Sequence, residues 1–366
     1  MNLYKLSAIA AALCFITAAI ITFTSGIASA GPFAIGFFLF GAIAFRGFEQ
    51  LKGFAYSMMI FTGVTTALYF PSYFVEFSGF KLTALIIPLI QIIMFGMGTS
   101  MSIGDFVAVV KTPKAVVIGV LAQFIIMPLL GFVLANISGL EPEIAAGIIL
   151  IGCSPSGLAS NVMNYLAKAN LALSITITSV TTLIAPVVTP MLMKLLAGTF
   201  VEINMLNMMW DISKMIILPI GAGLLFNKFL QGKSKWLDAA MPIVSMAGIG
   251  IIITIITAAG RNSLLEIGLI LIVLVFIHNT AGYTLGYWSA RMLKMDERDC
   301  RTVAIEVGMQ NGGLASGIAK EMGKIATVGL APAVFGPLMN ITGSILASYW
   351  HRRPPKEIGK QAIDNF

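Results

Sequence analysis

Long apolar segments recur along nearly the whole chain, separated by short gaps that contain charged residues, glycine or proline. Each segment is close to the roughly 20 residues with which a helix crosses about 30 Å of hydrocarbon. We predict membrane-crossing helices over residues 5–25, 32–46, 55–74, 82–100, 114–135, 144–165, 171–196, 211–227, 239–259, 266–290, 301–320 and 326–349. The segment 32–46 is barely long enough to cross. The pattern predicts an all-α polytopic membrane protein.

The amino-acid composition agrees with a membrane location. Of the 366 residues, 58% are hydrophobic and only 11% are charged, which leaves too little polar surface for a soluble protein. The net charge of +7 would suggest nucleic-acid binding in a soluble protein. Here the basic residues lie in short gaps between apolar segments, as the positive-inside rule describes, so we expect the lipid bilayer and no nucleic acid as partner.

The lysines and arginines are unevenly divided between alternate gaps. If the basic tail 351–366 is cytoplasmic, most of them fall on the cytoplasmic side. The opposite side holds Lys81, Lys194, Arg261, Lys320 and Lys324. Because positive charge is retained on the cytoplasmic side, we expect an integral protein of the inner or plasma membrane with a cytoplasmic C-terminus.

The first 50 residues form an additional membrane segment, a single helix or a hairpin. Lys5, the apolar run from Leu6 to Phe23 and the triplet Ala28-Ser29-Ala30 together resemble a secretory signal with a cleavage site. Since many crossing segments follow, we expect a retained helix instead. The N-terminus is then cytoplasmic only if 32–46 crosses.

A short repeat divides the rest of the chain into two halves. Gly157-Leu158-Ala159-Ser160 recurs as Gly313-Leu314-Ala315-Ser316, and the same offset carries several crossing segments of the first half onto those of the second. Each half, 51–200 and 201–350, then contains five crossing helices. Because five is an odd number, the second half enters the membrane from the opposite side, which is the inverted repeat of many secondary transporters.

Each copy of the repeat lies where helix-breaking residues interrupt an apolar segment, at 152–157 and at 308–313. Broken helices persist inside a membrane only where they line a cavity or bind a ligand. Helix N-termini at Leu158 and Gly313 would point inward. The partial positive charge and free N–H groups of two such ends form a site for an anion.

Oxygen-bearing side chains lie close to both interruptions and suit a hard cation such as sodium. They are Gln123, Ser160, Asn161, Ser174, Thr178, Glu306 and Gln310. Ser174 and Thr178 are four residues apart and share one helix face.

Glu306 is the strongest individual signal, because a carboxylate at a helix centre costs about 2.5–3.5 kcal/mol on insertion scales. It has no nearby basic partner in its own segment. A bound cation would compensate it. A proton is the alternative and would imply a proton-coupled transporter, while a neutral structural glutamate is the third possibility.

The chain contains no signal of an intramembrane enzyme. It has no HExxH and no GxSxG motif, and its two histidines are His278 and His351. We therefore expect a transporter and no enzyme, with a membrane sensor that does not transport as a further alternative.

Three linked motifs resemble those of the bile acid:sodium symporter (BASS) family, over about residues 55–350. They are Met94-Phe95-Gly96-Met97-Gly98, then Gly157-Leu158-Ala159-Ser160-Asn161 followed by Leu166-Ala167-Lys168, and Glu306-Val307-Gly308-Met309-Gln310-Asn311. The resemblance implies a ten-helix core with a panel domain and a core domain, and two discontinuous helices that cross at mid-membrane.

The resemblance also implies two sodium ions behind the crossing. Ser160, Asn161, Ser174, Thr178 and Glu306 would hold the first. The second would be held by Gln123, Glu306, Gln310 and the carbonyl groups of Val307 and Met309. Leu158, Asn311 and Gly313 would face the substrate.

The residue at position 158 departs from the pattern of bacterial relatives, which often have a small hydroxyl residue there. Leu158 removes one donor to an anion. Members of the family carry bile acids, pantoate, pyruvate and other 2-oxo or hydroxy acids. We expect sodium-coupled import of a small organic anion by alternating access, with a larger bile-acid-like anion as second choice and a monomer as a plausible assembly.

Overall fold

The computed structural model describes residues 3–48, 51–101, 113–230 and 235–355, so most of the predicted tail 351–366 lies outside the described residues. Within these ranges nine helices are long and apolar enough to cross a membrane. The prediction of an all-α polytopic membrane protein is confirmed. The helices are α1 (Leu3–Ser25), η1 (Ile27–Ala30), α2 (Gly31–Phe45), η2 (Lys52–Phe54), α3 (Ala55–Tyr69), α4 (Ser72–Val75), η3 (Leu82–Leu85), α5 (Ile86–Ser100), α7 (Pro113–Ile137), α8 (Pro142–Cys153), α9 (Ala159–Leu166), α10 (Leu171–Ala197), α11 (Met205–Leu230), α12 (Lys235–Ala259), α13 (Arg261–Met292), α14 (Glu297–Gly308), α15 (Gly312–Glu321) and α16 (Leu330–His351).

One predicted helix is shorter in the structure. The segment 55–74 was expected to be one helix, but α3 ends at Tyr69. Pro71 follows, and the residue before a proline is disfavoured in the helical conformation. A two-residue hairpin, β1 (Glu76–Phe77) with β2 (Phe80–Lys81), lies beyond it. Its turn residues both have positive φ, as two-residue hairpin turns require.

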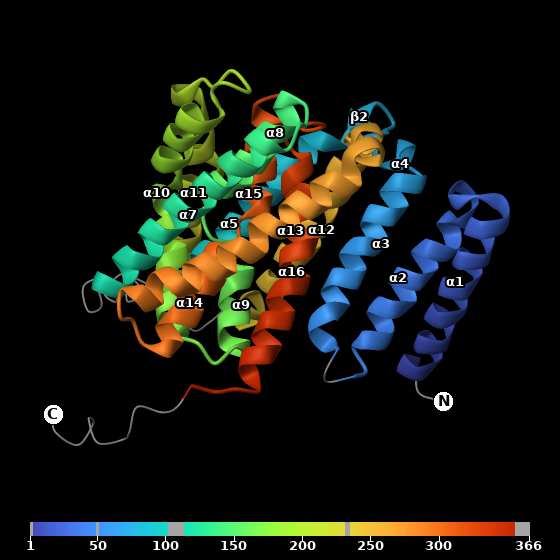
Figure 1. The fold of residues 1–366 in the computed structure, drawn as a ribbon, viewed down its shortest axis with the longest axis horizontal. Coiled ribbons are helices and arrows are strands. Elements are labelled where there is room, and N and C mark those ends of the chain that lie inside the picture. Colours follow the sequence, from blue (N-terminus) through green and yellow to red (C-terminus); the bar gives the residue numbers. More distant parts are fainter. Residues whose placement is uncertain (1–2, 49–50, 102–112, 231–234, 356–366) are drawn as a thin grey trace.

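The N-terminal segment is a helical hairpin. A crossing helix was predicted over 32–46, where the apolar segment is barely long enough. In the structure the helical stretch is longer: Ile27–Phe45 has 19 residues and is apolar enough to cross. In Figure 1 the helices α1 and α2 lie side by side at one edge of the molecule, with α2 against α3. The Tyr69 hydroxyl donates to the carbonyl of Ile27 at 2.7 Å, and Gly31 allows the same ring to approach the start of α2.

The remaining helices form two groups. The panel group consists of α3, α5, α11 and α12, which pack against one another. The core group consists of α7 to α10 and α13 to α16. The two halves of the chain repeat the same packing pairs, since α7 contacts α8 as α13 contacts α14, and α7 contacts α10 as α13 contacts α16. This agrees with the repeat, and the inverted orientation of the halves stays a prediction.

Two helices of the core group are interrupted, and their interruptions meet. Helix α8 ends at Cys153 because Pro155 lacks an N–H group and holds Ser154 in an extended conformation. In Figure 1 α8 and α15 lie toward the upper end and α14 and α9 toward the lower end, so the two broken helices cross.

Backbone hydrogen bonds join the two segments at the crossing. Gly157 N donates to Met309 O and Asn311 N donates to Pro155 O, both at 2.8 Å. These bonds satisfy polar groups that the interruptions release inside the membrane region. Two discontinuous crossing helices were predicted, and the structure confirms them.

A buried arginine makes hydrogen bonds to the ends of three helices of the core group. Arg301, only 5% exposed, donates to the Glu297 carboxylate at 2.8 Å and to the carbonyl of Arg353 at 2.9 Å. Its remaining N–H groups reach the carbonyls of Ala167 and Trp350 at 3.4 and 3.3 Å. The ends of α9, α14 and α16 therefore share one guanidinium group.

We expect the substitution Arg301→Gln to destabilise the protein by about 3 kcal/mol, because it leaves several buried acceptors without a donor. Thermal unfolding in detergent measures the effect. Arg291→Gln is the control, because its pair with Glu297 is long, at 3.9 Å, and its side chain is 51% exposed. Equal unfolding temperatures for the two variants would contradict the role given to Arg301.

Candidate functional site

The carboxylate of Glu306 lies near the end of α14 and is fully buried. Its Oε1 atom accepts hydrogen bonds from Ser160 Oγ at 2.6 Å, from Ser174 Oγ at 2.6 Å and from Asn164 Nδ2 at 3.1 Å. Its Oε2 atom accepts from Thr178 Oγ1 at 2.7 Å. Two helices of the first half, α9 and α10, thus supply the donors to a carboxylate of the second half.

Helical spacing explains how these donors converge. Ser160 and Asn164 are four residues apart on α9, and Ser174 and Thr178 are four residues apart on α10. Side chains with this spacing lie above one another on one helix face. Two short polar stripes therefore face Glu306 from neighbouring helices.

Asn161 completes the first set of residues that the sequence predicts for sodium. Its Oδ1 atom lies 2.7 Å from Ser174 Oγ and 3.4 Å from Thr178 Oγ1, and the single proton of each hydroxyl points either to Asn161 or to Glu306. The structure therefore brings together the hydroxyl, amide and carboxylate oxygens of this set: Ser160, Asn161, Ser174, Thr178 and Glu306.

The charge of this cluster is uncompensated by basic side chains. None of the ion pairs in the described ranges includes Glu306. Hydrogen bonds to a carboxylate stabilise its negative charge, and hydroxyl oxygens that donate still have lone pairs for a ligand. The arrangement is suited to binding a small hard cation through oxygen atoms.

The second predicted set is centred on two glutamines. Gln123 Nε2 donates to Gln310 Oε1 at 2.7 Å and to Ser154 O at 2.9 Å. Gln310 Nε2 donates to Val307 O at 2.6 Å. Met309 O accepts the bond from Gly157 at the crossing. Gln123, Gln310 and Val307 are thus in direct contact and Met309 lies at the crossing, and the oxygens of these four already accept hydrogen bonds from protein donors. The Glu306 carboxylate, the fifth predicted member, bonds residues around the first set.

Sequence reasoning missed several residues of the site. Asn164 contacts Glu306, and its spacing of four from Ser160 was the available signal. Ser156 Oγ donates to the carbonyl of Glu306 at 3.0 Å, and Thr189 Oγ1 donates to the carbonyl of Cys153 at 2.8 Å. The last two contacts satisfy backbone groups near the interruptions, which no sequence pattern identifies.

The polar pair His278-Asn279 on α13 supports the second interruption. Asn279 Nδ2 donates to Gly308 O at 2.8 Å, and Asn279 Oδ1 accepts from Thr342 on α16 at 2.6 Å. His278 Nε2 bonds the carbonyl of Met127 on α7 at 2.9 Å. Both side chains therefore make hydrogen bonds between helices.

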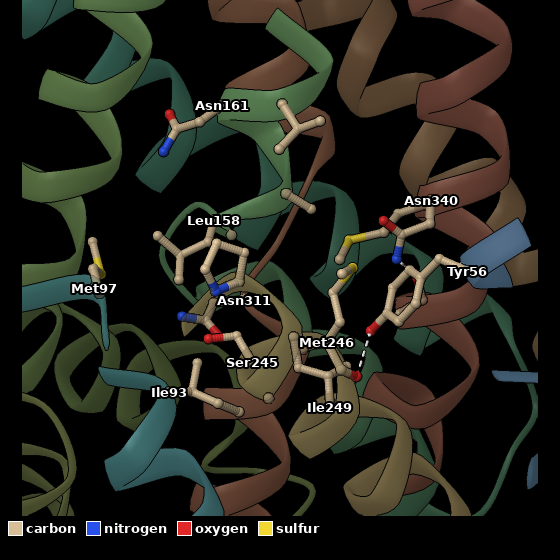
Figure 2. Close-up of a pocket in the computed structure, with 18 of the residues that line it drawn as sticks. Tyr56, Ile93, Met97, Leu158, Asn161, Ser245, Met246, Ile249, Asn311 and Asn340 are labelled. Atoms are coloured by element: carbon tan, nitrogen blue, oxygen red, sulfur yellow. Dashed lines mark hydrogen bonds between the residues drawn. The ribbon is translucent and has the colours of Figure 1, made fainter. Parts of the chain in front are cut away.

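A cavity of about 490 Å³ lies between the panel group and the core group, in front of the crossing. The residues predicted to face a substrate, Leu158, Asn311 and Gly313, line this cavity, and Figure 2 shows Leu158 and Asn311 among its lining residues. The remaining wall is mostly apolar, with Ser245 and Asn340 among its polar side chains. This matches ligand pockets that combine an apolar lining with a few polar groups.

The helix N-termini at the cavity differ by one residue from the predicted positions. Helix α9 begins at Ala159 and α15 begins at Gly312, with Leu158 and Asn311 as the residues before them. Asn311 Oδ1 accepts from Leu314 N at 3.0 Å and caps α15. Its Nδ2 amide is then the part of the side chain that can donate to an anion.

Comparison with known proteins gives one consistent result. Residues 87–267 match the model of the sodium bile acid symporter family. The chain is 38% identical over 313 residues to the "Uncharacterized sodium-dependent transporter YocS" of Bacillus subtilis, covering 85% of this chain and 95% of that protein. It is 31% identical to the "Probable sodium/metabolite cotransporter BASS1, chloroplastic" of Arabidopsis thaliana, covering 74% and 67%. With these matches and the crossing of two broken helices, the chain belongs to the sodium bile acid symporter family, whose members are membrane transporters and not enzymes.

Proposed function

We propose that this sodium-coupled transporter imports a small organic anion across the inner or plasma membrane. The observation that carries the proposal is the buried Glu306 carboxylate, because its residue bonds Ser156 at the crossing and its cluster includes Asn161, which lines the cavity. An ion bound behind the crossing and an anion in front of it would act on the same interrupted helices. That proximity provides a physical route for coupling.

Two sodium ions are proposed. The first would be bound by the oxygens of Ser160, Asn161, Ser174, Thr178 and Glu306. The second would lie beside Glu306, Gln123 and Gln310, with the carbonyls of Val307 and Met309 as further ligands. Because Gln310 Nε2 now occupies Val307 O at 2.6 Å, binding of the second ion requires this amide to move.

The anion would bind at the front of the crossing. The N-termini of α9 and α15 carry partial positive charge, and Asn311 adds an amide donor. Leu158 contributes apolar surface at the place where a hydroxyl would add a donor. We therefore infer that backbone N–H groups and Asn311 hold the carboxylate.

Two classes of anion remain candidates for the cargo. A small 2-oxo or hydroxy acid such as pantoate fits the limited polar surface at the crossing. The volume of about 490 Å³ and the mostly apolar wall favour, as a second candidate, a larger amphipathic anion of the bile-acid kind.

We infer alternating access from the position of the cavity. Its lining extends from the crossing to Lys52 and to Leu166, whose carbonyl bonds His351 at the end of α16. The positive-inside rule assigns this end, and the C-terminus, to the cytoplasm. The structure would then be the inward-facing state, and movement of the core group against the panel group would expose the site outward.

Two other functions make different predictions. A proton-coupled transporter would use Glu306 to carry a proton and would need no sodium. A membrane sensor would bind the anion without moving it. The donors around Glu306 stabilise its charged form, in which the carboxylate could bind a cation.

Thermal unfolding in detergent tests the proposal and identifies the cargo. We expect pantoate, pyruvate or taurocholate to raise the unfolding temperature in sodium chloride and to have little effect in equimolar potassium chloride. The reason is that a ligand stabilises only the state it binds, and sodium would organise that state. Stabilisation of equal size in the two salts would contradict sodium coupling.

A further inference from the structure

The side chain of Asn164 is an unusual member of the cluster around Glu306. It lies on α9, one turn after Ser160, and the residue is fully buried. Its Nδ2 group donates to Ser174 Oγ at 2.8 Å and to Glu306 Oε1 at 3.1 Å. Within the described ranges, however, its Oδ1 atom has no hydrogen-bond partner.

The network fixes the orientation of this amide. Reversing it would remove the donor from Glu306 and place two acceptor oxygens against each other. The atom without a partner is therefore an oxygen. A buried carbonyl oxygen without a partner is unfavourable, because it has lost its hydrogen bonds to water and gained none in return.

The position of this oxygen is within reach of an ion at the first sodium set. The oxygen and nitrogen of one amide are about 2.2 Å apart, so Asn164 Oδ1 lies within about 5.3 Å of Glu306 Oε1. Two oxygens that bind one hard cation at about 2.3–2.6 Å each are separated by up to about 5 Å. The upper bound on the separation of the two oxygens is therefore close to this limit.

We propose that Asn164 is a further ligand residue of the first sodium site, with its amide oxygen binding the ion while its N–H group holds the carboxylate. This inference rests on the proposed sodium coupling. The residue differs from the neighbouring serines and threonine, because separate atoms of its side chain would make the two contacts. Its N–H group would bond the Glu306 carboxylate, and its amide oxygen would bind the ion.

A sodium titration of thermal stability, without any anion, tests this role. We expect Asn164→Leu, which has a similar shape and no oxygen, to raise the sodium concentration for half-maximal stabilisation about tenfold. We also expect a changed ratio of the sodium and lithium midpoints, since a lost ligand alters the size of the site. Thr181→Val is the matched control, because this buried hydroxyl bonds only carbonyls of its own helix.

A second variant separates an ion ligand from a residue that merely holds Glu306. Asn164→Asp keeps an oxygen at the position and loses the N–H donor. We expect its sodium midpoint to stay within about threefold of the parent, whereas a residue needed only as a donor would make this variant at least as weak as Asn164→Leu. If Asn164→Leu is not recovered folded, Asn164→Ser replaces it. We expect the sodium midpoint of Asn164→Ser to be higher than that of the parent protein.

The outcomes distinguish this inference from the proposed function. Loss of the sodium response in Glu306→Gln together with an unchanged midpoint in Asn164→Leu would overturn the role of Asn164 alone. No sodium response in the parent protein would overturn both.

Discussion

Replacing Glu306 with glutamine is expected to lower sodium-driven anion uptake by about 100-fold or more. The substitution keeps the size of the side chain and removes the negative charge that both proposed sodium sites share. A factor of 100 corresponds to about 2.7 kcal/mol, and losing a charged ligand in a buried site has an effect of at least that size. Uptake into proteoliposomes measures it, with the sodium midpoint of thermal stabilisation as a second readout.

The same substitution at an exposed position provides the control. Glu266 lies on α13 with an exposed side chain, and we expect Glu266→Gln to transport as the parent does. Glu306→Gln should also unfold at a similar or higher temperature without sodium, since it no longer buries a charge. Normal sodium-driven uptake by Glu306→Gln would exclude the carboxylate as the coupling group.

Adding one methyl group at Gly157 is expected to abolish the sodium response and to destabilise the protein by about 3 kcal/mol. A Cβ atom at this position would lie 2.6 Å from Gln310 O, inside the contact distance of the two interrupted segments. Gly157 N also donates to Met309 O, so separating the segments would break the bridge at the crossing. The proposed second ion site depends on the same backbone.

Gly250→Ala is the control for this effect. Gly250 lies within α12, where an added Cβ atom meets no other atom within 4 Å, and alanine favours a helix. We expect the unfolding temperature and the sodium midpoint of Gly250→Ala to match the parent or improve slightly. If Gly157→Ala kept its sodium response, close contact of the segments would not be required for ion binding.

Within the described ranges, nine of the twelve segments predicted to cross correspond to helices that are long and apolar enough to do so, because hydrocarbon thickness sets their length. The predicted helix bounds were wrong where proline or turn residues end a helix within an apolar stretch. The segment 55–74 reads as one apolar run, yet Pro71 ends the helix and Ser78-Gly79 forms a hairpin turn. The two interruptions were found because glycine and proline residues gather there and because the motif is repeated.

The residues of the candidate site were only partly predictable. Oxygen-bearing side chains near the interruptions were identified from their chemistry, and Glu306 from its cost in a membrane. Asn164 escaped notice, because its role depends on how α9 and α10 pack around the carboxylate. The contact between Gln123 and Gln310 joins residues distant in sequence, and so it required the fold.

The most direct test of the account is uptake of labelled pantoate, pyruvate and taurocholate into proteoliposomes under three conditions. These are an inward sodium gradient, an equal potassium gradient, and an inward proton gradient without sodium. We expect at least one of these anions to accumulate above its external concentration with sodium alone. Equal uptake with potassium, or accumulation driven by protons without sodium, would contradict it.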